Sequence, residues 1–136
     1  MWPIIAITFF ATVIFVLSFV HERKEMGKYL LRSCIGVSFR WRRQFPNASK
    51  NEIREFLDQF TEAFGFKTSW RLHFLPDDRV MDIYRVRYPI RGTPDGCELE
   101  YLIKLLRKRY GIDVFKSWRE DVTLGDLFTR IREHNS

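Results

Sequence analysis

Cysteine is scarce in this chain of 136 residues, and the usual catalytic signatures are missing. Its two cysteines, Cys34 and Cys97, are too few for the disulfide framework of a small secreted domain, so both are expected to stay reduced. The three histidines are far apart in sequence and lack the spacing of metal ligands. No Gly-x-Ser-x-Gly, P-loop or dinucleotide-binding motif is present. The sequence therefore predicts neither an enzyme nor a resident metal ion or cofactor.

Charge is absent from the first twenty residues, whose only polar side chains are two threonines and one serine. A helix rises about 1.5 Å per residue, so roughly 20 apolar residues can cross a hydrocarbon core of about 30 Å. A cleaved signal peptide is the nearest alternative, but it would need a basic N-terminal region, a shorter apolar run and a small-residue cleavage site. None of these three features is present. A helix buried in the protein core is the remaining alternative. We predict a single membrane span over residues 1–21.

Positive charge is concentrated directly after this apolar run. Residues 21–50 carry a net charge of +6, whereas residues 51–136 are neutral. The positive-inside rule predicts a single-pass protein with its C-terminal domain in the cytoplasm. Because the surplus charge is juxtamembrane, the expected partners are the bilayer and its anionic headgroups, and no nucleic acid. The predicted membrane-surface residues are Arg23, Lys24, Lys28, Arg32, Arg40, Trp41, Arg42 and Arg43.

Residues 22–48 are interpreted as a basic juxtamembrane linker. This linker would either lie against the headgroups or stay solvated and only fix the topology. Cys34 lies within it and is a candidate for S-acylation near the bilayer. The remaining residues, 49–136, are enough for one small domain with one core.

Residues 49–136 contain helical patterns separated by glycine and proline. Ser49 and Glu52 form a capping-box pattern, after which apolar residues recur at helical spacing until Gly65. Residues 66–74 fit either a short strand or a packed loop. A short helix is predicted between Pro76 and Pro89.

Two further helices are predicted nearer the C-terminus. One opens at residues 93–95, with Pro94 in its first turn, and ends at Gly111. After a connector, Thr123 and Asp126 form a second box-like cap that starts a short terminal helix. The expected fold is all-α: one transmembrane helix followed by three or four helices around a single core.

Several motifs of this second region resemble a known family. The segments DGCELE at 95–100, YGI at 110–112 and DVTLGDL at 121–127 resemble the second half of an acyl carrier protein. The stretch LPDDRVMDIY at 75–84, with the same TLGDL motif, is similar to the bacterial family DUF1493, itself acyl-carrier-like. The resemblance implies an acyl-carrier-like helical bundle over residues 49–136. Since the family is bacterial, it also implies that the predicted span lies in a bacterial inner membrane.

One position departs from the carrier pattern. Acyl carrier proteins attach phosphopantetheine to the serine of an Asp-Ser-Leu motif, and the corresponding residue here is Gly96. No ester linkage can form without a hydroxyl group, so no cofactor is expected. A shift of one residue in the alignment would place Cys97 at this position. A thiol in the first turn of a helix can have a lowered pKa. The alternative is that Cys97 is a small, buried apolar residue of the core.

Two functional hypotheses follow. The first is a membrane-anchored, non-catalytic adaptor or regulatory module that binds an unidentified protein, either transiently or as a small subunit of a membrane complex. The second is a carrier or accessory component of lipid or acyl metabolism, either binding a lipid chain or modified at Cys97. The predicted partner contacts are Arg91, Asp95, Glu98, Lys104, Arg107 and Lys108.

Overall fold

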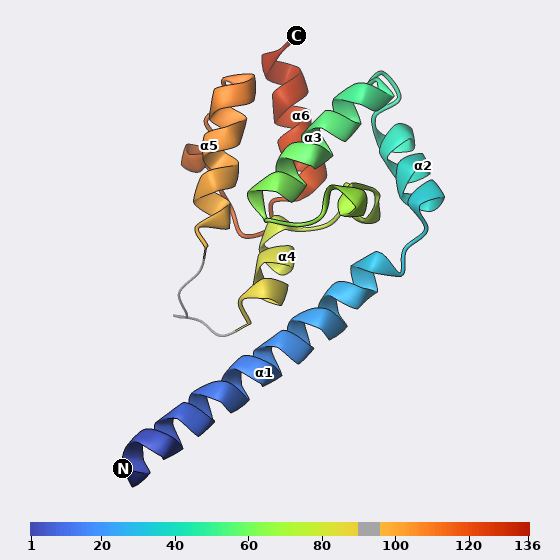
Figure 1. The fold of residues 1–136 in the computed structure, drawn as a ribbon. Helices are drawn as coiled ribbons and strands as arrows, with labels where there is room; N and C mark the ends of the chain where they lie inside the picture. The colour runs from blue at the N-terminus through green and yellow to red at the C-terminus, as the bar shows by residue number, and fades with distance from the viewer. Residues whose placement is uncertain (90–95) are drawn as a thin grey trace.

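The computed structural model describes residues 1–89 and 96–136, which form helices joined by short loops (Figure 1). In chain order these are α1 (Trp2–Leu30), α2 (Cys34–Gln44), α3 (Lys50–Ala63), the 3-10 helix η1 (Thr68–His73), α4 (Val80–Arg87), α5 (Glu98–Tyr110), the 3-10 helix η2 (Phe115–Ser117) and α6 (Leu124–His134). Within these residues no strand is formed, and one isolated bridge joins Arg79 to Thr123. The prediction of an all-α chain, with a long apolar helix before a helical domain, is confirmed.

The N-terminal half of α1 extends away from the domain (Figure 1). Its apolar side chains are exposed, including Phe10 at 69% and Phe15 at 73%. An 18-residue window of α1 has a mean hydropathy of 2.5, and none of that window is buried. By length and composition this helix can cross a membrane. Because its apolar surface is not covered by protein, the alternative of a core helix is wrong.

The C-terminal end of α1 belongs to the domain. Met26 is buried, and Tyr29 and Leu30 pack against the core. The Tyr29 ring lies 5.7 Å from that of Phe74, and α1 packs on α4 and η1. Residues 22–30 therefore continue the helix into the domain, and the predicted linker does not begin at residue 22.

α2 is also part of the domain rather than a linker. Ser33 caps it by accepting a hydrogen bond from the Gly36 N–H, and Val37 and Trp41 on its inner face are buried. The Trp41 indole Nε1 donates to the Phe74 carbonyl at 2.8 Å. The prediction that Trp41 lies at the membrane surface is wrong, because Val37 and Trp41, four residues apart, lie on one helix face that packs into the core.

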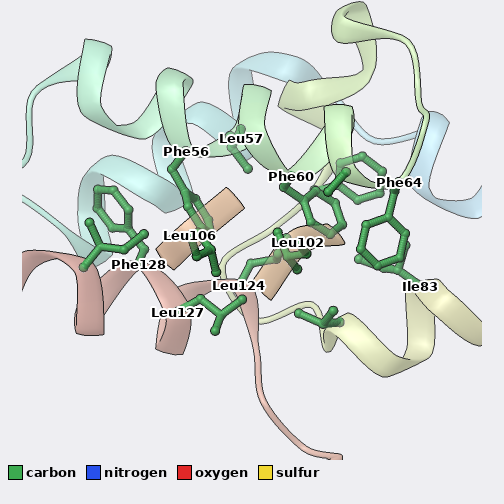
Figure 2. Packing of buried hydrophobic residues seen from close by; sticks show 14 of the residues in the cluster. Phe56, Leu57, Phe60, Phe64, Ile83, Leu102, Leu106, Leu124, Leu127 and Phe128 are labelled. Atoms are coloured by element: carbon green, nitrogen blue, oxygen red, sulfur yellow. The ribbon is translucent and has the colours of Figure 1, made fainter. Parts of the chain in front are cut away.

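The core lies between α3, α5 and α6, as Figure 2 shows for its larger side chains. The apolar stripe predicted for residues 49–64 is the inner face of α3, and the leucines of α5 and α6 pack beneath it. The side chains that fill the core include Phe56, Leu57, Phe60, Leu102, Leu106, Leu124, Leu127 and Phe128. The helical periodicity of the sequence therefore located the principal core correctly.

Two segments that carry the family resemblance are joined by backbone hydrogen bonds. The N–H groups of Leu124 and Gly125 donate to the carbonyls of Asp78 and Pro76, at 3.0 and 2.8 Å. A Cβ atom on Gly125 would lie 3.0 Å from the Pro76 carbonyl oxygen, so the approach requires glycine. The glycine of the TLGDL motif thus allows α6 to begin directly against residues 76–78.

Most predicted helix boundaries hold, with three differences. The capping boxes at Ser49 and Thr123 are both present. Residues 68–73 form the 3-10 helix η1 rather than a strand, and α4 begins at Val80 instead of near Pro76. α5 begins at Glu98, after the N-cap Cys97, and not at residues 93–95, which lie outside the described residues. Gly111 caps its C-terminal end, as predicted.

An ion pair fixes the turn between α1 and α2. The Arg32 guanidinium donates to both carboxylate oxygens of Asp78, at 2.5 and 2.9 Å, and to the His73 carbonyl at 3.1 Å. The Asp78 side chain is 10% exposed and also accepts from the Leu75 N–H at 2.7 Å. This carboxylate therefore links the end of α1 to the loop before α4.

The Asp78→Ala variant is expected to lower the free energy of unfolding by about 2 to 3 kcal/mol, because it leaves the Arg32 guanidinium and a backbone N–H without their acceptor. Asp77→Ala is the matched control, since the Asp77 carboxylate is 59% exposed and pairs with the exposed Arg40. Urea denaturation of the detergent-solubilised protein, followed by circular dichroism, measures both. Equal stability of the two variants would contradict a role for Asp78 in joining α1 to the domain.

Candidate functional site

An apolar groove lies between α5 and η2. Its volume is about 530 Å³. Leu99 and Ile103, one turn apart on α5, form one wall, and Phe115 and Trp118 form the other. Phe115 is 69% exposed, although aromatic side chains of this size usually find cover within a domain. The groove is thus an exposed apolar surface with two aromatic side chains.

Local hydrogen bonds fix the shape of the η2 wall. Asp113 Oδ1 accepts from the Phe115 N–H at 3.1 Å, and the other carboxylate oxygen pairs with Arg107 at 3.0 Å. These two interactions, first the bond from Arg107 and then that from the Phe115 N–H, hold the pKa of Asp113 below its ordinary value. Asp113 therefore ties η2 to α5 and keeps Phe115 at the surface.

The rim of the groove is mainly basic. Lys104 and Arg107 line it and are exposed, while Glu100 is the single acidic residue among those that line it. Lys108 is exposed on the same helix, next to Arg107. Four of the six predicted partner contacts therefore lie on α5, and two of them, Lys104 and Arg107, border the groove.

Three predicted contacts are not among the described residues of this basic rim. Arg91 and Asp95 are outside the described residues. Glu98 is 6% exposed, so its prediction as a surface contact is wrong. Its side chain turns inward, where Oε1 accepts from the Tyr88 hydroxyl at 2.5 Å and lies 3.6 Å from Arg87 Nε. Burial, followed by this hydrogen bond, raises the pKa of Tyr88.

The surroundings of Gly96, which the resemblance aligns with the carrier serine, are crowded. A Cβ atom on Gly96 would lie 2.9 Å from Glu98 Oε1 and 3.3 Å from Glu98 Cδ. The Gly96 N–H donates to the Tyr88 hydroxyl at 2.9 Å, which holds the backbone in this place. Cys97 caps α5 with a φ of 58°, and its side chain is exposed rather than buried. A side chain at residue 96 would therefore displace the Glu98 carboxylate.

The predicted membrane-surface residues are divided among three places. Arg23 and Lys24 are exposed on α1 directly after the apolar run, followed by Lys28, which pairs with Glu25. Arg32 and Arg40 are paired with Asp78 and Asp77 of the domain, and Trp41 is in the core. Arg42 and Arg43 are exposed on α2. Three of the eight thus lie close to the end of the apolar run.

Sequence reasoning missed the aromatic wall of the groove. Residues 112–118 were predicted only as a connector, because they lack helical spacing. The available signal was the presence of Phe115 and Trp118 in a short connector between two helices. Among the described residues, no group of three or more potential metal ligands gathers.

Comparison of the chain with protein-family models, with curated proteins and with solved structures found no match.

Proposed function

We propose that this protein is a membrane-anchored, non-catalytic interaction module of the bacterial inner membrane. α1 spans the bilayer once, the helical domain lies on the cytoplasmic side, and the α5–η2 groove binds a protein partner. The observation that carries the proposal is the groove itself, where Phe115 stays 69% exposed beside a basic rim.

The membrane part rests on the properties of α1. Its exposed apolar surface has no protein cover, and water is a poor solvent for such a surface. Arg23 and Lys24 follow the apolar run directly, where they favour retention of this end in the cytoplasm. Near anionic headgroups each such residue contributes about 1 kcal/mol of attraction.

The partner is an acidic amphipathic helix of another protein. An amphipathic helix places its apolar face in such a groove, and the half-exposed Leu99 and Ile103 with Phe115 and Trp118 supply the apolar contact. Acidic residues on the partner then lie close to Lys104 and Arg107 at the rim. Aromatic residues and arginine contribute the largest binding energies in protein interfaces.

The domain belongs to the acyl-carrier-like bundles in this proposal, but it does not carry an acyl chain on a phosphopantetheine group at position 96. The paired backbone of residues 76–78 and 124–125 supports the relation, since both segments carry the resemblance. Position 96 has no hydroxyl group, and a side chain there would displace the Glu98 carboxylate, which supports binding over cofactor attachment.

Site-specific photo-crosslinking in intact bacteria tests the proposed groove. A benzophenone amino acid at position 115 is expected to give one defined adduct in the membrane fraction. The double change of Lys104→Glu and Arg107→Glu is expected to reduce this adduct by about tenfold, because it replaces attraction of an acidic partner by repulsion.

Position 101 provides the matched control. Tyr101 lies on the same helix and is 42% exposed, but its hydroxyl faces Glu62 of α3 at 3.3 Å. Adducts of the same size and amount from positions 101 and 115, or no effect of charge reversal, would refute the groove as the binding surface.

A further inference from the structure

We propose that Cys34 is a nucleophilic thiol, paired with His73, that accepts an acyl group from an anionic acyl thioester bound in a second groove. This groove lies beside α2, has a volume of about 1100 Å³ and includes Cys34, Ile35, Phe39 and Leu72 in its lining. α2 and α5 lie on opposite sides of the domain (Figure 1), so this site is separate from the proposed partner groove.

The thiol and the imidazole are in contact. Cys34 Sγ lies 3.6 Å from His73 Nε2, and His73 Nδ1 lies 3.1 Å from the Arg32 carbonyl oxygen. A carbonyl oxygen only accepts hydrogen bonds, so Nδ1 carries the proton that makes this contact. The Nε2 atom of the neutral ring is then the acceptor for the Cys34 thiol proton. This is the arrangement of a nucleophile, a base and a group that orients the base.

Two further contacts hold the pair. The Arg32 guanidinium donates to the His73 carbonyl at 3.1 Å and is itself fixed by Asp78, so both sides of the turn are tied. Cys34 is the first residue of α2, so the capped start of this helix fixes the position of the thiol. The dyad is exposed to ligands because Cys34 lies at the surface.

The lining of the groove indicates the chemical class of substrate. Ile35 is 84% exposed and Phe39 is 63% exposed, one turn apart on α2, and they form an apolar strip that starts beside the thiol. Arg42, Arg43 and Lys50 form the basic part of the lining, and no acidic side chain lines the groove within the described residues.

An acyl thioester of a phosphate-bearing thiol fits each of these features. Its carbonyl carbon is the electrophile for the thiolate, its acyl chain fits the apolar strip, and its phosphates fit the arginines. A small disulfide would react with the thiol but would leave the apolar strip unused. The observations therefore favour acyl transfer over thiol–disulfide exchange.

The transfer step is a thioester exchange without oxidation or reduction. His73 Nε2 takes the proton of the Cys34 thiol as Sγ attacks the carbonyl carbon and forms a new carbon–sulfur bond. The bond between that carbon and the donor sulfur breaks, and the departing thiolate takes the proton from His73. The products are S-acyl Cys34 and the thiol of the donor.

Octanoyl-coenzyme A and acetyl-coenzyme A, added to the full-length protein in lipid nanodiscs, test the proposal by intact mass and peptide mapping. One octanoyl group is expected on Cys34, and octanoyl transfer is expected to exceed acetyl transfer by about tenfold because of apolar contact. His73→Gln is expected to slow acylation of Cys34 by about a hundredfold, since it removes the base.

Two controls keep the test decisive. Cys97 in the same molecule is the internal reference, and its acylation rate is expected not to change in His73→Gln. Phe39→Ser alters an exposed side chain and is expected to remove the preference for octanoyl over acetyl transfer while Cys34 remains reactive.

Three results would overturn the proposal. One is an equal change of both cysteines in His73→Gln, and another is a chain-length preference that survives in Phe39→Ser. The third is a Cys34 that forms a mixed disulfide with oxidised glutathione but is not acylated by either thioester. This result would show thiol–disulfide exchange in place of acyl transfer.

Discussion

Replacing both Phe10 and Ile14 by arginine is expected to move the protein out of the membrane fraction. Both side chains are exposed on α1 and lie near the middle of its apolar run. An arginine at the centre of a spanning helix costs about 2.5 to 3.5 kcal/mol, so two cost roughly 5 to 7 kcal/mol. The fraction that pellets with membranes after alkaline carbonate extraction measures the effect.

Leu31→Arg is the matched control for this experiment. Leu31 is 89% exposed and lies beyond the end of α1, so an arginine there is expected to leave the membrane fraction unchanged. The intact mass of the wild-type protein is read from the same membranes, because an uncleaved chain distinguishes an anchor from a signal peptide. Retention of the double-arginine variant in the pellet would show that α1 does not hold the protein there.

Trp41→Ala is expected to lower the free energy of unfolding by about 3 to 5 kcal/mol. The Trp41 side chain is fully buried, and its ring lies 5.7 Å from that of Phe128 and 6.0 Å from that of Phe56. Truncation opens a cavity among these aromatic side chains and leaves the Phe74 carbonyl without its donor. Because small domains are stable by only about 5 to 15 kcal/mol, this loss is a large part of the total stability.

Phe39→Ala, on the outer face of the same helix, is the matched control. Its side chain is 63% exposed, and its loss is expected to change the free energy of unfolding by less than about 0.5 kcal/mol. Urea denaturation followed by circular dichroism compares the two variants. If Trp41→Ala were as stable as Phe39→Ala, α2 would be a peripheral linker, and the domain would begin near residue 49.

The sequence patterns correctly predicted the features that depend on residues close together in the chain: helix starts, helix ends and the buried face of a helix. The boxes at Ser49 and Thr123 start helices because the side chains satisfy backbone N–H groups three residues away. Gly111 ends α5 because it adopts the left-handed conformation, with a φ of 73°. The buried stripe of α3 follows from its 3.6-residue period alone.

The errors came from interactions between residues distant in sequence. The basic residues near Trp41 suggest a membrane surface, but its indole donor finds the Phe74 carbonyl 33 residues away. Glu98 has the position of an exposed first-turn acid, yet Tyr88 and Arg87 draw it inward. Neither pairing has a signal in the local pattern of hydrophobicity or charge.

The sequence by itself determined the all-α class, the apolar N-terminal helix, the capped helix starts at Ser49 and Thr123, and the principal core, because each depends on spacing within one segment. Only the tertiary structure decided that α2 belongs to the domain, that Phe115 and Trp118 form a groove with α5, and that Cys34 meets His73. These features need chain segments that approach after folding, so their physical cause is the packing of helices rather than the period of any one helix.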